Sequence, residues 1–395
     1  MLVLLLAQVT FARPRARDLG VPFEGVTGPL NAITDVAGVE VGHVTLISGE
    51  GKLDVGRGPV RTGVTAILPR GKSAGAPPVL GGAFALNGNG EVTGLAWLEE
   101  SGFLEGPIVL TNTHSVGVAR DAVIAWQVRK RDKDLTGITW SLPVVGETWD
   151  GWLSDINGFH VKPDHVFAAL DTASGGAVAE GSVGGGTGMV SYEFKAGIGT
   201  ASRKLAADIG GHTLGVLVQA NHGVRRQLLV AGVPVGREIG GGSRRFAGSD
   251  PNDLAGVSVG ETGSILIIIA TDAPLLPHQL KRLARRASLG LARTGAVSGN
   301  GSGDFFLAFS TANSAASRTE GPPVALTTLT NEAMSPLFEC TVEAVEEAII
   351  NALVASDTMN GRDGRVAEGI PLTRLQEILA RYNRLAPAAA PISGR

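Results

Sequence analysis

Short apolar runs of strand length alternate along the chain with longer stretches in which apolar residues recur at helical spacing. Strands are predicted at residues 58–69, 79–86, 165–171, 214–219, 264–270 and 305–310. Helices are predicted at residues 115–128, 277–293, 335–353 and 372–382. Because strands and helices mix without the strict alternation of a doubly wound sheet, the pattern favours an α/β (α+β) sandwich of two sheets between helix layers.

The composition of the chain changes before one of these strands. From Arg237 to Gly263 the sequence is rich in glycine and polar residues. A separate segment, Val21 to Leu46, alternates apolar stretches with Gly and Pro and suggests strands joined by turns. Ser264–Ala270 is then a continuous apolar run, which is typical of a strand buried on both faces. The length of 395 residues allows one large layered domain or two ordinary ones. We expect one domain over residues 15–383, with a disordered tail at 384–395.

Composition and charge exclude several classes of function. The net charge is −3 with acids and bases interspersed, so the chain lacks the basic stripe of a nucleic-acid groove. The single cysteine, Cys340, precludes an internal disulfide and has the apolar neighbours of a core thiol. Met1–Ala12 is apolar but too short to span a bilayer and has no basic residues before it. Export and a misassigned start codon both remain open, and with them a periplasmic or a cytoplasmic location.

Three motifs are set aside. The glycine run Gly184–Gly188 lacks the lysine of a phosphate-binding loop, and the seven scattered histidines form no metal-binding pair. Gly256–Gly260 matches the Gly-x-Ser-x-Gly pattern around Ser258, but no strand precedes it and no helix follows it. We therefore expect no metal and no cofactor, and an esterase that uses Ser258 is a weaker alternative.

A Gly-Ser bond lies where the glycine-rich segment enters the buried strand. Glycine leaves the carbonyl of Gly263 approachable, and the strand fixes Ser264. A hydroxyl held in this way can attack the preceding carbonyl and form an ester that water hydrolyses. The product is a serine with a free α-amine, whose ordinary pKa of about 7.7–8 suits proton transfer near neutrality. Gly-Ser alone is a trivial dipeptide, so other residues must support this interpretation.

A second polar cluster lies downstream, at Ser298–Asp304. Ser302 and Asp304 are two residues apart, so on a strand their side chains share a face. A carboxylate there can orient a hydroxyl that accepts the proton of a nucleophile. The same stretch is also compatible with an ordinary glycine-serine turn that carries an exposed acid.

Longer blocks of sequence resemble the DmpA-type family, also called the L-aminopeptidase/D-esterase family, which includes the β-peptidyl aminopeptidases. The similarity spans about residues 15–353 and is carried by Ser264, by Ser298–Asp304 and by the blocks 28–36, 151–158, 184–189, 194–203, 219–221, 270–280, 331–338 and 346–348. It implies an αββα sandwich reminiscent of N-terminal-nucleophile hydrolases but with different connectivity. It also implies a precursor cut into residues 1–263 and 264–395, which stay associated as a homotetramer of such pairs.

The resemblance also assigns roles to individual residues. Ser264 would be the nucleophile, Ser302 and Asp304 would complete the relay, and the side-chain amide of Asn221 would supply an oxyanion donor. Glu147 would pair with the free amine of the substrate, because a buried ammonium needs a counter-charge.

One residue departs from the family pattern. Trp149 stands where the family more usually has tyrosine, so a hydroxyl is replaced by an indole N–H that can only donate.

The resemblance as a whole leads to the hypothesis of a cofactor-free serine aminopeptidase that releases small N-terminal residues from peptides, amides or esters. D- and β-amino acids are left open as substrates. Trp149 motivates a competing hypothesis, a homologue that has lost catalysis and serves as a binding or assembly protein.

Overall fold

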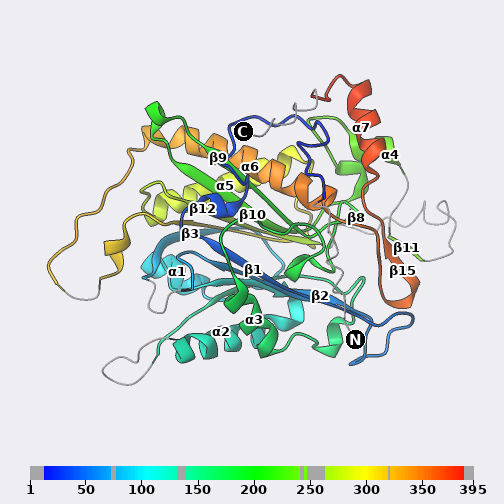
Figure 1. The fold of residues 1–395 in the computed structure, drawn as a ribbon, viewed down its shortest axis with the longest axis horizontal. Coiled ribbons are helices and arrows are strands. Elements are labelled where there is room, and N and C mark those ends of the chain that lie inside the picture. The colour runs from blue at the N-terminus through cyan, green and yellow to red at the C-terminus, as the bar shows by residue number, and fades with distance from the viewer. Residues whose placement is uncertain are drawn as a thin grey trace, which may run out of the picture.

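The computed structural model describes residues 13–72, 77–130, 139–240, 244–246, 263–318 and 321–386. They form four layers, in which two sheets lie face to face and helices cover the outer face of each (Figure 1). This arrangement confirms the predicted αββα sandwich.

Six strands form the larger sheet, in the order β4-β3-β13-β12-β10-β9. Their bounds are Phe103–Leu104 (β4), Val79–Gly88 (β3), Gly303–Ser310 (β13), Ser264–Thr271 (β12), Thr213–Asn221 (β10) and Ile198–Lys204 (β9). Neighbours are antiparallel except β12 and β13, which run parallel at the centre of the sheet.

The smaller sheet has four strands in the order β1-β2-β5-β6. They span Glu40–Ser48 (β1), Val60–Leu68 (β2), Ile108–Asn112 (β5) and Val144–Thr148 (β6). Two minor sheets lie outside the sandwich: β11 (Arg244–Phe246) with β15 (Arg365–Ala367) and β14 (Met359–Asn360), and β7 (Val190–Ser191) with β8 (Phe194–Lys195).

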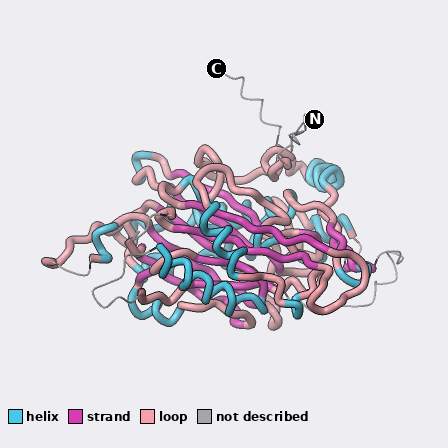
Figure 2. Tube along the Cα trace, turned by 60° about the horizontal axis from the view of Figure 1, so that its bottom comes forward, coloured by secondary structure: helices cyan, strands magenta, loops and turns pink. Residues whose placement is uncertain are grey.

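The main helices pack on opposite outer faces of the sandwich. Helices α5 (Pro277–Arg293) and α6 (Ser335–Val354) cover the larger sheet, and α2 (Val116–Lys130) and α3 (Pro163–Thr172) cover the smaller one (Figure 1). When the view is turned so that the side of α2 and α3 comes forward, helical segments cross in front of the strands (Figure 2). The remaining helices are α1 (Leu95–Ser101), α4 (Val235–Ile239) and α7 (Leu372–Arg381). Within the described ranges, no helix is both long and apolar enough to cross a bilayer.

Strand β12 contributes to two hydrophobic cores because strand side chains alternate between faces. Ile265, Ile267 and Ile269 pack toward α5 and α6, whereas Leu266 and Ile268 point into the space between the sheets. A strand buried on both faces therefore begins directly at Ser264, as predicted.

Most predicted elements are confirmed, including α5 with both of its ends. The stretch 165–171 was predicted as a strand, and this prediction is wrong: it lies within α3. Pro163 is at the first helical turn, and Val166, Ala169 and Leu170 are buried at spacings of three and four residues, which is a helical period. Between 21 and 39 the chain is irregular except for one short turn of 3₁₀-helix, so a strand occurs only from Glu40.

The predicted linker is described in part. It contains the end of α4 and all of β11, whereas residues 241–243 and 247–262 lie outside the described residues, as do 1–12 and 387–395. Cys340 is buried in the hydrophobic core, as expected, and burial raises the pKa of its thiol to about 12.

Candidate active site

Ser264 is the first residue of the central strand of the larger sheet. Strand β12 pairs with β10 on one side and β13 on the other, and Ser264 lies directly opposite Asn221 of β10. By the alternation along β12, Ser264 faces the space between the sheets, as Leu266 does. The serine is 5% exposed, so its hydroxyl is fixed in a mostly buried place at the end of the sheet.

The Ser264 hydroxyl lies beside the turn that leads into β13. Its Oγ accepts a hydrogen bond from the backbone N–H of Gly303 at 3.1 Å. Ser302 Oγ donates to Asp304 Oδ1 at 2.8 Å, and the N–H of Ile265 donates to the same carboxylate oxygen at 3.2 Å. Asp304 therefore holds both the residue after the predicted nucleophile and the hydroxyl of the predicted relay.

Glycines and a neighbouring strand shape this turn. Asn87 of β3 donates from Nδ2 to the carbonyls of Ser298 and Gly299, at 3.1 and 2.6 Å. A Cβ on Gly303 would lie 2.3 Å from the carbonyl oxygen of Asn89, so only glycine allows this approach. Strand β3 thus holds the glycine-serine run, whose last three residues, 302–304, are buried. The alternative of a turn with an exposed acid is wrong for Asp304, which is fully buried.

Gly263 is packed against the last residues of β10. A Cβ at this position would lie 1.7 Å from the carbonyl oxygen of Asn221 and 3.1 Å from Cα of His222. Only a residue without a side chain fits there. The glycine at the predicted cleavage position is therefore required by packing as well as by access to its carbonyl.

The Asn221 side chain is held at both ends. Its Oδ1 accepts from the N–H of Val190 at 2.9 Å, and its Nδ2 donates to the carbonyl of Trp149 at 2.9 Å. An amide nitrogen carries two N–H groups, so one donor remains to be directed elsewhere. The structure thus brings Asn221 to the nucleophile and fixes which way its amide points.

Glu147 lies near the end of β6 and is only 4% exposed. Its carboxylate accepts from the N–H of Glu91 at 2.9 Å and from the hydroxyl of Thr113. Burial raises the pKa of Glu147, and the hydrogen bonds from Thr113 and Glu91 oppose this shift. A buried carboxylate that accepts from a backbone N–H and a hydroxyl is suited to receive a cation from outside.

Glu147 and Ser264 belong to one site because Gly90 connects them. A Cβ on Gly90 would lie 3.1 Å from Glu147 Oε1 and 3.6 Å from Cα of Gly303, whose N–H binds Ser264 Oγ. Trp149 is half-buried, and its ring packs on Gly151, where a Cβ would lie 2.6 Å from the indole. The structure therefore brings together all of the predicted site residues that it describes.

Sequence reasoning missed three contributors: the Gly303 N–H, the Thr113 hydroxyl and the Glu91 N–H. Backbone donors give no sequence signal, and Thr113 could have been suspected only because it follows the end of a strand.

Ser258, the alternative nucleophile, lies outside the described residues. The glycine run begins with a buried turn of 3₁₀-helix, Gly184–Gly186, packed against β1 and β2. Among the residues that the structure describes, no cluster of three or more His, Cys, Asp or Glu could hold a metal ion.

This arrangement can be compared with known proteins. A family model described as peptidase family S58 matches residues 31–367, most of the chain. The chain belongs to peptidase family S58. It is therefore a hydrolase of the peptidase class, as the resemblance in its sequence implied.

Known aminopeptidases resemble the chain over nearly its full length. It is 52% identical to the β-peptidyl aminopeptidase BapA of Sphingosinicella microcystinivorans, over 98% of this chain and 97% of the relative. The structure of the L-aminopeptidase D-Ala-esterase/amidase from Ochrobactrum anthropi matches with a TM-score of 0.85 and 46% identity, covering 95% of this chain and 100% of that one. A Burkholderia sp. β-aminopeptidase matches with a TM-score of 0.81 and 48% identity, over 93% and 99% of the two chains. The Ochrobactrum enzyme is described as a variant of the Ntn-hydrolase fold and a prototype of the serine aminopeptidases, and this protein shares that fold and is an aminopeptidase.

Proposed function

We propose that this aminopeptidase activates itself by cleaving its own Gly263–Ser264 bond. Ser264 Oγ attacks the Gly263 carbonyl, the bond between Oγ and that carbon forms, and the C–N bond breaks as the proton passes from the hydroxyl to the nitrogen. Water then hydrolyses the ester, leaving a carboxylate on Gly263 and a free α-amine on Ser264. The observation that carries this proposal is the placement of Ser264. It begins a rigid central strand and directly follows Gly263, a position where no residue with a Cβ fits.

The same hydroxyl then acts on substrates. Asp304 orients the Ser302 hydroxyl through the 2.8 Å hydrogen bond, and Ser302 relays the proton of Ser264. The Gly303 N–H stabilises negative charge on the nucleophile because it already points at Oγ. Asn221 supplies an oxyanion donor from its side chain, which the carbonyl of Trp149 and the N–H of Val190 hold in place.

Glu147 makes the enzyme an exopeptidase. A substrate ammonium pairs with this carboxylate, and the buried site excludes substrates whose amine is blocked. We therefore propose small N-terminal residues of peptides, amides or esters as substrates, including the β-amino acids named in two relatives and the D-alanine named in a third. The backbone carbonyl of Trp149 accepts the hydrogen bond from Asn221, so the exchange of tyrosine for tryptophan preserves that contact. This favours an active enzyme over a homologue that has lost catalysis.

The two chains formed by cleavage are expected to stay together. In the order β4-β3-β13-β12-β10-β9, the two central strands belong to residues 264–395 and the four flanking strands to residues 1–263. Separating the chains would break strand pairing on both sides of the centre and expose the hydrophobic core. We further propose that such pairs associate as a homotetramer, as the family resemblance implies.

The test is the variant Ser264→Ala, compared with Ser258→Ala as its control. A denaturing gel with intact-mass measurement should show two wild-type fragments that meet at the 263/264 junction, and a single uncut chain for Ser264→Ala. Hydrolysis of alanine p-nitroanilide should be lost in Ser264→Ala and kept in Ser258→Ala. Normal splitting or activity in Ser264→Ala would refute the proposal, and loss of activity in Ser258→Ala alone would favour the esterase alternative.

A further inference from the structure

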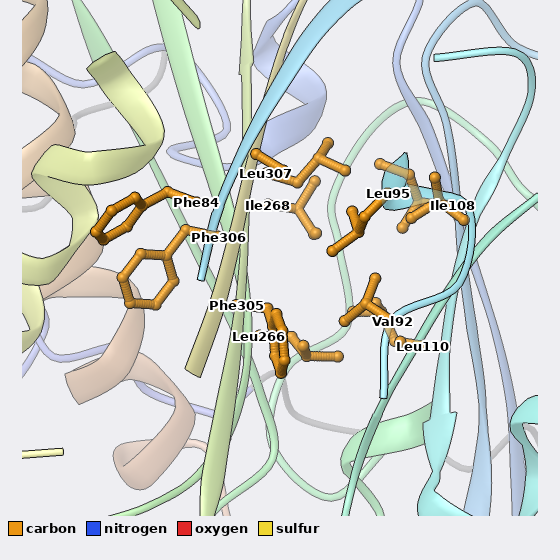
Figure 3. A pocket seen from close by; sticks show the side chains of 13 residues that line it. Phe84, Val92, Leu95, Ile108, Leu110, Leu266, Ile268, Phe305, Phe306 and Leu307 are labelled. Atoms are coloured by element: carbon orange, nitrogen blue, oxygen red, sulfur yellow. The ribbon is translucent and has the colours of Figure 1, made fainter. Parts of the chain in front are cut away.

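One lysine is fully buried beside the residues that hold Asn221. The core between the two sheets is apolar around Leu266 and Leu110 (Figure 3). Lys195 of β8, by contrast, carries an amine into the interior and is 0% exposed. Burial lowers the pKa of Lys195 to about 7, which reflects the cost of removing an ammonium from water. A buried ionisable group of this kind is expected where a function depends on it.

The Lys195 amine is surrounded by main-chain carbonyls. Its Nζ donates to the carbonyl of Met189 at 3.0 Å, to that of Ala196, and to that of Gly186 at a longer 3.5 Å. An ammonium has three N–H groups, so three acceptors match its protonated form. Gly186 ends the 3₁₀ turn of the glycine run, and a Cβ there would lie 2.5 Å from the backbone N of Ile198. The glycine run therefore packs closely enough to present a carbonyl to this amine.

A tight hairpin fixes the place of Lys195. Strands β7 and β8 are joined by two residues, and Val190 pairs directly with Lys195. Both turn residues, Tyr192 and Glu193, have positive φ values, 49° and 59°. This conformation suits a two-residue hairpin but costs energy for residues that carry a Cβ. The chain accepts this cost at a turn that places Lys195 opposite Val190.

The peptide group between Met189 and Val190 connects Lys195 to Asn221. Its carbonyl oxygen, on Met189, accepts from Lys195 Nζ, and its N–H, on Val190, donates to Asn221 Oδ1 at 2.9 Å. Because a peptide group is planar, a bond that fixes its carbonyl end also fixes its N–H end. Hydrogen bonds in a chain also polarise one another, so a donor at the Met189 oxygen strengthens the bond that Val190 makes to Asn221.

We propose that Lys195 is a positioning residue for the oxyanion donor: it holds the Met189–Val190 peptide and, through it, the side chain of Asn221. The inference rests on the proposed function, in which the Asn221 amide stabilises the negative charge that develops on the substrate carbonyl oxygen. Lys195 acts only through this peptide. Its removal should therefore weaken stabilisation of the transition state and leave binding of the substrate ammonium at Glu147 unchanged.

The test compares Lys195→Met with Tyr192→Phe. Lys195→Met keeps an unbranched side chain but removes every donor, whereas Tyr192→Phe removes a buried 2.6 Å hydrogen bond to Thr294 from the same hairpin. With alanine p-nitroanilide, kcat per processed enzyme should fall about 10-fold or more in Lys195→Met, and by less than the roughly 10²- to 10³-fold that loss of an oxyanion donor costs. KM should stay within about 2-fold, because an interaction made only in the transition state is lost. Tyr192→Phe should keep both values.

A double-mutant cycle with Asn221→Ala tests whether Lys195 acts through Asn221. The donor is absent in that background, so Lys195→Met should change kcat by no more than about 2-fold there. Lys195→Gln keeps two N–H donors on a slightly shorter side chain and should lose less kcat than Lys195→Met. It also carries the test if Lys195→Met does not fold or is not processed, as checked by circular dichroism, thermal melting and intact mass.

The outcomes separate this inference from the proposed function. If the wild-type enzyme does not hydrolyse the substrate, or if Asn221→Ala keeps the wild-type kcat, the proposed function fails and this inference fails with it. The inference alone is wrong if Asn221→Ala is impaired but the Lys195 variants lower kcat no further than Tyr192→Phe does. It is also wrong if Lys195→Met raises only KM, or lowers kcat by the same factor with and without the Asn221 amide.

Discussion

The substitution Gly263→Ala tests whether the packing of the cleavage position controls self-processing. The added Cβ would lie 1.7 Å from the carbonyl oxygen of Asn221, whereas real Cβ contacts essentially never fall below 3.0 Å. The backbone must therefore shift by at least about 1.3 Å (3.0 − 1.7), because the obstacle is the backbone of β10 and not a flexible side chain. Overpacking of this kind costs about 1–3 kcal/mol.

The larger effect should be on the rate of cleavage. The Gly263 carbonyl is the electrophile that Ser264 attacks, and a misplacement of about 1 Å can cost about 10²-fold in rate. We expect self-cleavage of Gly263→Ala to be slower by at least about that factor, as followed by the loss of the uncut band on denaturing gels over time. Gly117→Ala is the control, since a Cβ at Gly117 of α2 meets nothing within 4 Å. If Gly263→Ala, folded by circular dichroism, is processed as fast as the wild type, the packing argument is wrong.

Two further predictions concern buried carboxylates. Glu147→Gln should lower kcat/KM for free-amine substrates by about 10²-fold or more, because the charge that pairs with the ammonium is lost. Since burial raises the pKa of Glu147, KM of the wild type should rise as the pH falls through that raised value, and the variant should lose this acid dependence; an unchanged KM profile would exclude Glu147 as the amine site. Burial also raises the pKa of Asp150 to about 7, so the folded state binds more protons than the unfolded state between pH 4 and pH 7, and stability falls as the pH rises through this window. Urea denaturation at pH 5 and pH 8 should show that Asp150→Asn removes roughly 3 kcal/mol of this difference, and an equal difference in both proteins would contradict the assignment.

The sequence predicted those features that depend on local order. The bounds of α5 follow from Pro277 and the helical spacing after it, and the short apolar run after the glycine-rich segment favoured the buried strand that begins at Ser264. The stretch 165–171 was misread because a short apolar run fits either a strand or a helix, and Pro163 at its start was the deciding signal. Spacing also predicted the contact of Ser302 with Asp304, because the two residues are neighbours in sequence.

The parts of the site that come from distant segments could not be predicted from pattern alone. Glu147 and Asn221 were found only through the resemblance to a family, since a lone acid or amide has no local signature. The Gly303 N–H gave no signal, because its place beside Ser264 depends on how β3, β12 and β13 are paired. Such features depend on which distant strands pair in the sheet, and no local pattern in the sequence indicates that pairing.

Both proposed reactions take place at the start of β12. This shared requirement explains why the start of β12 lies at the centre of the larger sheet. Self-cleavage and substrate hydrolysis both require the Ser264 hydroxyl to be held against a carbonyl, and positioning of this kind depends on supporting structure that does not move. Strand β12 is buried on both faces and paired on both edges, so Ser264 is fixed where β12 begins. The residue before it, Gly263, packs against Asn221, which is also the proposed oxyanion donor. Cleavage would free the Gly263 carboxyl end from this place, and the groups that aligned the chain's own carbonyl would then be available to a substrate.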